Sequence, residues 1–245
     1  MSNKITIEDV AKEAGEHEWK LLSTSYKNLQ TPLKFECNEG HSLELPFKAV
    51  RNKWICPVCA ANKYDEAGHS MEVVEKKKDV YRTLALDQAT HTSGWSVFDG
   101  DELIKYGIFS TRGSNEIERL AEMREWLIQM ITVWNVDLVA IEGIQYQQYA
   151  GVTTFQTLAR LQGALMITIY ESKKEMEICP TNTWRSYNKV KGRSRSDKKQ
   201  SAKKIVKDTY DVTVTEDEAD SILIGRYASH KCARHTAKHV KMVRF

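Results

Sequence analysis

Residues 83–87 read TLALD, an apolar run that ends on an acidic side chain. Such a run predicts a buried β-strand. Residues 137–142 read DLVAIE, with the continuously apolar centre that is typical of a central parallel strand, and they too end on an acid. If the two strands are parallel neighbours, Asp87 and Glu142 share the edge of an open α/β sheet where functional groups gather. These two runs therefore predict both the fold class and the place of a site.

The flanking sequence supplies the other elements of such a sheet. Helical spacing of apolar residues predicts helices, and short apolar runs predict strands. The predicted elements are strands at 94–98 and 103–109 around the turn pair Asp99-Gly100, a helix capped by Ser114 and ending near 134, a helix over about 155–169, a strand at 177–179, a basic helix at 196–210 and a last helix from Thr215. The order β-β-β-α-β-α-β-α-α indicates a mixed α/β sheet flanked by helices.

Asp217 and Asp220 add two acids to the predicted site. They lie three residues apart in the first turn of the last predicted helix, and so on one face of it. Each acid alone has a structural explanation, because a helix N-terminus favours negative charge. Together with Asp87 and Glu142 they would place four carboxylates in one cleft, where cations must compensate the negative charge. Carboxylate oxygens suit Mg²⁺ or Mn²⁺. We therefore expect a two-metal site for phosphodiester hydrolysis.

A second metal site is predicted near the N-terminus. Cys37 and His41 form one close pair, and Cys56 and Cys59 form another. Three thiolates and an imidazole at this spacing favour a tetrahedral, structural Zn²⁺ over a set of free buried cysteines. The chain has 5 cysteines, and an odd count in a protein without secretory features argues against a disulfide framework.

Composition and charge limit the class of protein. With 41% hydrophobic and 28% charged residues over 245 positions, a packed core is feasible. No apolar run is long enough to span a bilayer, and residues 1–10 lack the apolar stretch of a signal peptide. We expect a cytoplasmic protein without membrane contact. The expected divisions are a zinc-binding domain at 1–62, a charged linker at 63–80, a catalytic domain at 81–230 and a basic tail at 231–245.

Basic and aromatic side chains near the acids indicate a nucleic-acid partner. The predicted phosphate contacts cluster around the basic helix and are Arg193, Arg195, Lys198, Lys199, Lys203 and Lys204. The alternative is a solvated helix face. Tyr146 and Tyr149, shortly after Glu142, could stack on exposed bases at a branch point, although buried packing explains them equally well.

The motifs resemble, in order and spacing, those of the RuvC family of Holliday-junction resolvases, particularly its phage-type members. The resemblance spans residues 83–228 and rests on LALD at 84–87, VAIE at 139–142, LARLQGAL at 158–165, RSDK at 195–198 and DEADSILI at 217–224. It implies a five-stranded RNase H-like sheet, and Asp87, Glu142, Asp217 and Asp220 as catalytic metal ligands. It also implies a homodimeric crossover junction endodeoxyribonuclease that cuts four-way DNA junctions in a bacterial or phage-infected cell. The cysteine-histidine segment resembles treble-clef-like zinc modules found beside phage nucleases.

Two departures from the family pattern stand out. Gln88, Ala89 and Thr90 replace the more usual Pro-Gly-like turn after the first aspartate, and no histidine follows Asp220 closely. Two other functions remain open at this stage: a less selective branched-DNA, flap or transposase-like nuclease of the same fold, and a non-catalytic junction-binding protein. An actin-like ATPase is disfavoured, because glycines for phosphate loops are sparse after Glu142.

Overall fold

The computed structural model describes residues 5–51, 56, 59, 75–77, 80–145 and 151–236, apart from the side chains of residues 49 and 232–236. The chain divides into two compact units, Met1–Lys63 and Tyr64–Phe245. Each unit has a hydrophobic core of its own. In the described part of the chain, no helix is long and apolar enough to cross a membrane.

The first unit is a small antiparallel sheet with two helices. Its elements are α1 (Ile7–Glu16), β1 (Trp19–Leu21), β2 (Pro32–Cys37), β3 (Ser42–Pro46) and α2 (Phe47–Arg51), with strand order β1-β2-β3. Thr6 and Asp9 form a reciprocal capping box at the start of α1. Phe35, Leu45 and Phe47 are fully buried and form the centre of the core. This core extends to Cys37 and Cys56, so the cysteine-histidine segment is part of the packed unit.

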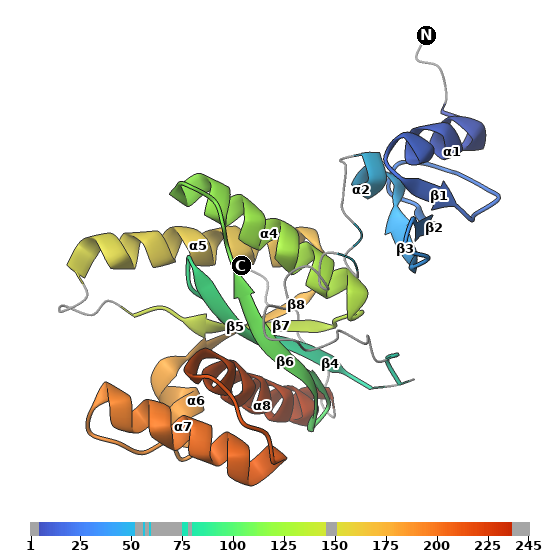
Figure 1. The fold of residues 1–245 in the computed structure, drawn as a ribbon. Coiled ribbons are helices and arrows are strands. Elements are labelled where there is room, and N and C mark those ends of the chain that lie inside the picture. The colour runs from blue at the N-terminus through green and yellow to red at the C-terminus, as the bar shows by residue number, and fades with distance from the viewer. Residues whose placement is uncertain are drawn as a thin grey trace. The chain divides into compact units, whose positions relative to one another are not determined.

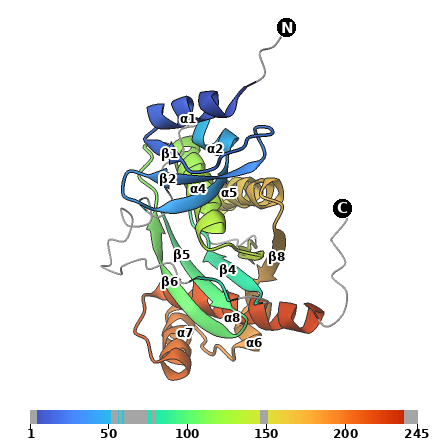
Figure 2. The same cartoon turned by 90° about the vertical axis from the view of Figure 1, so that its right-hand side faces the viewer.

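The second unit is a five-stranded mixed sheet between helices (Figures 1 and 2). Its elements are β4 (Arg82–Asp87), β5 (Thr92–Asp99), β6 (Glu102–Ser110), α4 (Glu116–Val133), β7 (Leu138–Gly143), α5 (Gly151–Glu171), β8 (Glu175–Pro180), α6 (Thr181–Tyr187), α7 (Arg195–Tyr210) and α8 (Glu216–Thr236). The strand order is β6-β5-β4-β7-β8. The predicted five-stranded mixed α/β sheet flanked by helices is confirmed.

The register of the central strands brings the two acidic strand ends together. β4 pairs antiparallel with β5 and parallel with β7, and Leu86 lies opposite Ile141. Asp87 and Glu142 each follow this pair directly, so they share the carboxyl edge of the sheet. The predicted parallel neighbourhood of the two strands is therefore confirmed.

The helices form two layers (Figure 1): α4 and α5 cover one face of the sheet, and α6, α7 and α8 cover the other. α8 packs closely on β5 because two glycines leave room for it. A Cβ at Gly94 would lie 2.0 Å from the carbonyl oxygen of Asp217, and one at Gly225 would lie 2.5 Å from the ring of Phe98. The absence of a side chain at Gly94 thus allows the first turn of α8 to approach the sheet.

Several predicted details differ from the structure. Helix α4 is capped by the Asn115 side chain, not by Ser114. The short helix α6 is missing from the predicted order. α8 continues to Thr236, six residues into the segment predicted as a tail, and residues 237–245 lie outside the described part. Asp99 belongs to β5 and pairs with Glu102, so the turn falls on Gly100 and Asp101.

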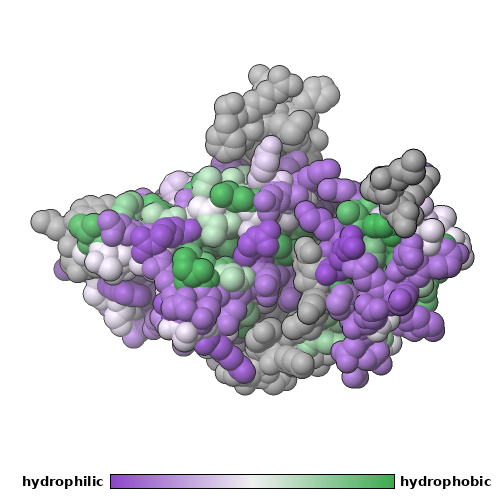
Figure 3. All heavy atoms as spheres, turned by 90° about the horizontal axis from the view of Figure 1, so that it is seen from above, coloured by the Kyte–Doolittle hydropathy of each residue, from purple (hydrophilic) through white to green (hydrophobic). Residues whose placement is uncertain are grey.

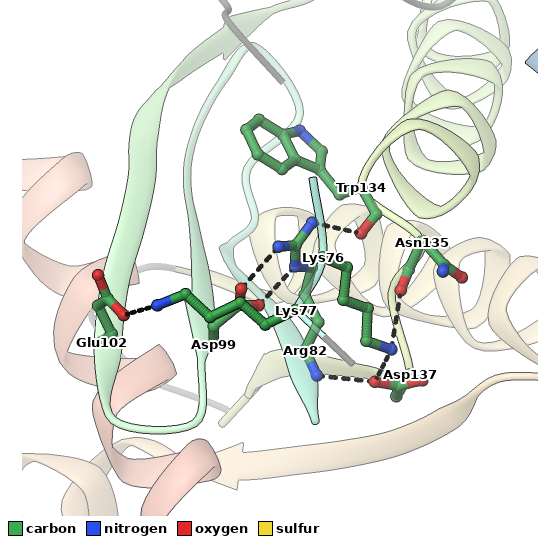
Figure 4. Close-up of polar contacts among 8 residues, drawn as sticks. All are labelled: Lys76, Lys77, Arg82, Asp99, Glu102, Trp134, Asn135 and Asp137. Carbon is green, nitrogen blue, oxygen red and sulfur yellow. Dashed lines mark hydrogen bonds and ion pairs between the residues drawn. The ribbon is translucent and has the colours of Figure 1, made fainter. Parts of the chain in front are cut away.

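Asp99 has a further role as one half of a buried ion pair with Arg82 (Figure 4). Both side chains are 1% exposed, and the guanidinium meets both carboxylate oxygens, at 2.5 and 2.6 Å. A third guanidinium nitrogen donates to the carbonyl oxygen of Trp134 at 3.1 Å. The Arg82 amide donates to Asp137, which also contacts Lys76. These contacts tie β4, β5 and the end of α4 together at the amino edge of β4.

Breaking this pair by Asp99→Asn should lower the free energy of unfolding of the second unit by about 3–5 kcal/mol, because an uncompensated guanidinium remains buried. Chemical denaturation followed by circular dichroism measures the loss. The matched control is Glu102→Gln, which breaks the exposed Lys77–Glu102 pair at the same end of the sheet and should change stability little. Equal effects of the two substitutions would contradict this account of Arg82 and Asp99.

Candidate active site and zinc centre

The four predicted acids occupy one end of the sheet in the second unit. Asp87 ends β4, and Glu142 is the last residue but one of β7. Asp217 and Asp220 lie in the first turns of α8, whose start is fixed by reciprocal hydrogen bonds between Thr215 and Glu218. The structure therefore brings all four side chains to the same edge.

Gly94 explains how α8 reaches the strand ends. It pairs with Asp87 across β4 and β5, and its bare Cα faces the backbone of Asp217. The Ser96 hydroxyl, two residues along β5, donates to the Ser221 carbonyl oxygen at 2.9 Å. The same short stretch of β5 thus contacts both the first strand acid and the helix that carries the last two.

Lys199 of α7 is a basic residue inside this acidic group. Its side chain is 8% exposed, and its ammonium lies 2.9 Å from Asp220 and 3.5 Å from Asp217. Arg185 of α6 lies 3.8 Å from Asp220. Four carboxylates thus face two basic groups, which leaves an excess of negative charge at the site.

The charge and burial of the site perturb its acids. Burial, followed by the nearby charges of Glu142 and Asp220, raises the pKa of Asp87 well above its usual value. Burial also raises the pKa of Asp220, with Lys199 opposing the shift. The mutual repulsion shows that the carboxylates lie within electrostatic reach of one another, and it favours a bound cation over four free anions.

Two residues of α6 hold the carboxylate of Glu142. The Thr181 hydroxyl and the Trp184 indole N–H donate to Oε1 of Glu142, at 2.9 and 3.0 Å. Burial raises the pKa of Glu142, and these two hydrogen bonds oppose the shift. Both bonds go to the same oxygen, so Oε2 remains to contact a cation. The donor set of the site consists of carboxylate oxygens alone, which suits hard divalent ions such as Mg²⁺ and Mn²⁺.

The predicted zinc ligands meet in the first unit. One ligand atom each from Cys37, His41, Cys56 and Cys59 lies within 4.8 Å of all the others. Nδ1 of His41 is 3.3–3.8 Å from the three sulfur atoms, and Sγ of Cys37 is 3.7 Å from Sγ of Cys59. Zinc forms bonds of about 2.3 Å to sulfur and about 2.0–2.1 Å to nitrogen. In a tetrahedral site these bonds place two sulfur atoms about 3.8 Å apart, and a sulfur and a nitrogen atom about 3.6 Å apart. The residues therefore fit a zinc ion.

The predicted DNA-contacting residues fall into three groups. Arg193, Arg195, Lys203 and Lys204 are exposed, and Lys198 is half-buried. Lys199 differs from them, because it lies on the buried face of α7 with Ala202 and Val206 and points to the acids. Tyr146 and Tyr149 lie outside the described residues.

Several side chains around the acids are not identified by the sequence pattern. Thr181, Trp184 and Arg185 all belong to α6, the helix absent from the predicted order. The available signal was Pro180, which ends a strand and begins a helix at the carboxyl edge of the sheet. Gln88, noted only as a departure from the family pattern, is buried and contacts Glu142.

Comparison with known proteins agrees with this geometry. A family model described as crossover junction endodeoxyribonuclease RuvC matches residues 83–225. Similar solved structures include Thermus thermophilus RuvC in complex with a Holliday junction substrate, at 11% identity and TM-score 0.54, covering 64% of this chain and 97% of that one. Another Thermus thermophilus RuvC structure has 13% identity and TM-score 0.51, and the match covers 63% of this chain and 97% of that one. A search of curated protein sequences found no significant match.

Proposed function

Since this chain belongs to the RuvC family of crossover junction endodeoxyribonucleases, we propose that Asp87, Glu142, Asp217 and Asp220 are its catalytic, metal-binding acids. It is a junction-resolving, metal-dependent endonuclease by family. The observation that supports these four residues is their convergence at one sheet edge with an excess of negative charge. These four carboxylates would hold two divalent cations, which would supply a water nucleophile of lowered pKa and stabilise the leaving oxygen.

The surrounding residues prepare the site for that chemistry. Thr181 and Trp184 hold one carboxylate oxygen of Glu142 and leave the other to bind a cation. Burial raises the pKa of Asp220, and the positive charges of Lys199 and Arg185 oppose that shift and offset part of the negative charge of the site. Because these groups are carried by helices that pack on the sheet, the carboxylates need little rearrangement when cations and DNA arrive.

The exposed basic residues at the start and outer face of α7 support binding to branched DNA. Arg193, Arg195, Lys203 and Lys204 are exposed on or just before the helix that brings Lys199 to the acids, and Lys198 adds to their positive charge. Such groups bind phosphates and position the duplex without reading its sequence. We assign Tyr146 and Tyr149 to contacts with the branch point on the sequence pattern alone. From the family alone, we propose that the enzyme acts in the cytoplasm of a bacterial or phage-infected cell.

A homodimer fits the symmetry of the substrate, since a four-way junction offers two equivalent strands to cut. On α5, Ile167 and Tyr170 lie one turn apart and are 61% and 78% exposed. Figure 3 looks down on the α4 and α5 side and shows hydrophobic groups in small patches between hydrophilic ones. We infer that this face of α5 pairs with a second copy.

The test of the function is a cleavage panel. The full chain with Mg²⁺ is incubated with a synthetic four-way junction, a flap and a plain duplex, beside its Asp220→Asn variant. We expect paired symmetric nicks in the junction, little cutting of the duplex and no cutting by the variant. Equal cutting of flap and junction would favour the less selective nuclease, and binding without cutting by the unmodified chain would favour a non-catalytic protein.

A further inference from the structure

Gln88, which follows the first acid of the site, contacts the strand that carries the second acid. Its side chain is buried, and its amide makes two hydrogen bonds to the backbone of Glu142. Nε2 donates to the Glu142 carbonyl oxygen at 2.6 Å, and Oε1 accepts from the Glu142 amide at 2.9 Å. The side chain thus satisfies both backbone groups of one residue.

These two hydrogen bonds extend the pairing of β4 with β7 by one residue beyond the point where the backbone hydrogen bonds between the two strands end. The last paired residues of β4 and β7 are Leu86 and Ile141, while β7 continues and pairs with β8 up to Gly143. The amide and carbonyl of Glu142 face the side where β4 stops. Without the Gln88 amide, two polar backbone groups beside a buried carboxylate lose this partner.

The loop that carries Gln88 is itself fixed. The Ser93 hydroxyl accepts from the Ala89 amide and donates to the Ala89 carbonyl, both at 2.9 Å. The Thr111 hydroxyl donates to the Thr90 carbonyl at 2.7 Å. Gln88 therefore extends from an anchored loop, so its amide can set the position of Glu142 and does not merely follow it.

We propose that Gln88 is a positioning residue, which fixes the separation of Asp87 and Glu142 and thereby the affinity of the site for divalent cations. The inference rests on the proposed function of the four acids. Gln88 adjoins Asp87 in the chain and holds Glu142 by its backbone, so it couples the two strand acids directly. Groups that orient metal ligands in this way affect metal affinity by about 10- to 100-fold.

The test is Gln88→Met, which keeps the length of the side chain and removes both hydrogen bonds. Calorimetric titration of the zinc-loaded full chain with Mn²⁺ alone, without DNA, should show a Kd for Mn²⁺ about 10- to 100-fold higher than in the unmodified protein. In junction cleavage, kcat at fixed Mg²⁺ should fall while KM for the junction stays within about twofold, and added Mg²⁺ should recover part of the loss.

Thr168→Val is the matched control, because it removes a buried hydrogen bond from a side chain to the backbone, Thr168 to Ala164, within α5. It should lower the unfolding temperature and leave the Kd for Mn²⁺ unchanged. Asp220→Asn identifies which Mn²⁺ signal belongs to the acids.

An unchanged Kd for Mn²⁺ in a folded Gln88→Met protein would overturn the positioning role and leave the proposed function standing. If the unmodified protein showed no Mn²⁺ binding sensitive to Asp220→Asn, the proposed function would fall, and the role of Gln88 with it.

Discussion

Asp87→Asn should reduce the rate of junction cleavage by at least about 1,000-fold, equivalent to ~4 kcal/mol of transition-state stabilisation. Asp87 ends the central strand β4, and its buried carboxylate lies within electrostatic reach of Glu142 and Asp220. An amide has the same shape but carries no negative charge, so it is a poor ligand for a divalent cation. Single-turnover cleavage with saturating enzyme measures the effect on chemistry without the effect on binding.

Junction affinity should change little in this variant, because the proposed phosphate contacts lie on α7. The control is Asp211→Asn, at the exposed end of that helix, where the side chain is 93% exposed. It makes the same chemical change away from the acids and should leave the cleavage rate within about twofold. A rate for Asp87→Asn near that of the control would exclude Asp87 from the reaction.

Asp87→Asn should also stabilise the metal-free protein. Burial and neighbouring acids raise the pKa of Asp87 in the folded state, so ionised Asp87 destabilises that state. The stability linked to this group is fully present below its unfolded pKa and is lost as pH rises through the folded pKa. With metal removed, the unfolding free energies of the two proteins should therefore converge in acid, and Asp87→Asn should be the more stable at neutral pH.

We propose that Cys37, His41, Cys56 and Cys59 bind a structural zinc ion, and its loss should unfold the first unit of the full chain and leave the second folded. Cys37, His41, Cys56 and Cys59 match the spacing of a closed tetrahedral site, which is structural because it has no open position for water. Zinc contributes about 10–16 kcal/mol of apparent binding energy in small domains, comparable with the whole stability of a typical domain. Cys56→Ser or chelation should thus remove amide protection from exchange in α1–α2 and retain it in β4–β8.

Cys179→Ala provides the matched control for this result. Cys179 is buried, as Cys56 is, but it lies in β8 of the second unit. Its loss should weaken the second unit and leave the zinc content at one ion per chain. Unchanged protection of α1–α2 in a Cys56→Ser protein that contains no zinc would contradict a structural role for the ion.

The sheet and its acidic edge were predictable because their signals are local. The apolar runs at 83–87 and 137–142 each carry their own strand pattern, and each ends on one of the acids that we propose as metal ligands. The cysteine and histidine spacing is equally self-contained. In each case the residue types and their spacing indicate the kind of metal site. The fold then brings two such segments together.

The residues that contact the acids or stabilise the sheet around them do so through tertiary contacts, which no local sequence pattern indicates. Lys199 belongs to a run of lysines, and only its position on the buried face of α7 separates it from its neighbours. Trp184 and Gln88 contact Glu142 from segments 42 and 54 residues away. Asp99 resembles a turn residue next to a glycine, and its pairing with Arg82 follows from the antiparallel register of β4 and β5.

Anomalous diffraction from a crystal soaked in Mn²⁺ is the most direct test of the metal-binding acids. We predict two peaks about 4 Å apart at the carboxyl edge of β4 and β7, within coordination distance of Asp87, Glu142, Asp217 and Asp220. Mn²⁺ bound only elsewhere, with these four side chains free of metal, would contradict the assignment.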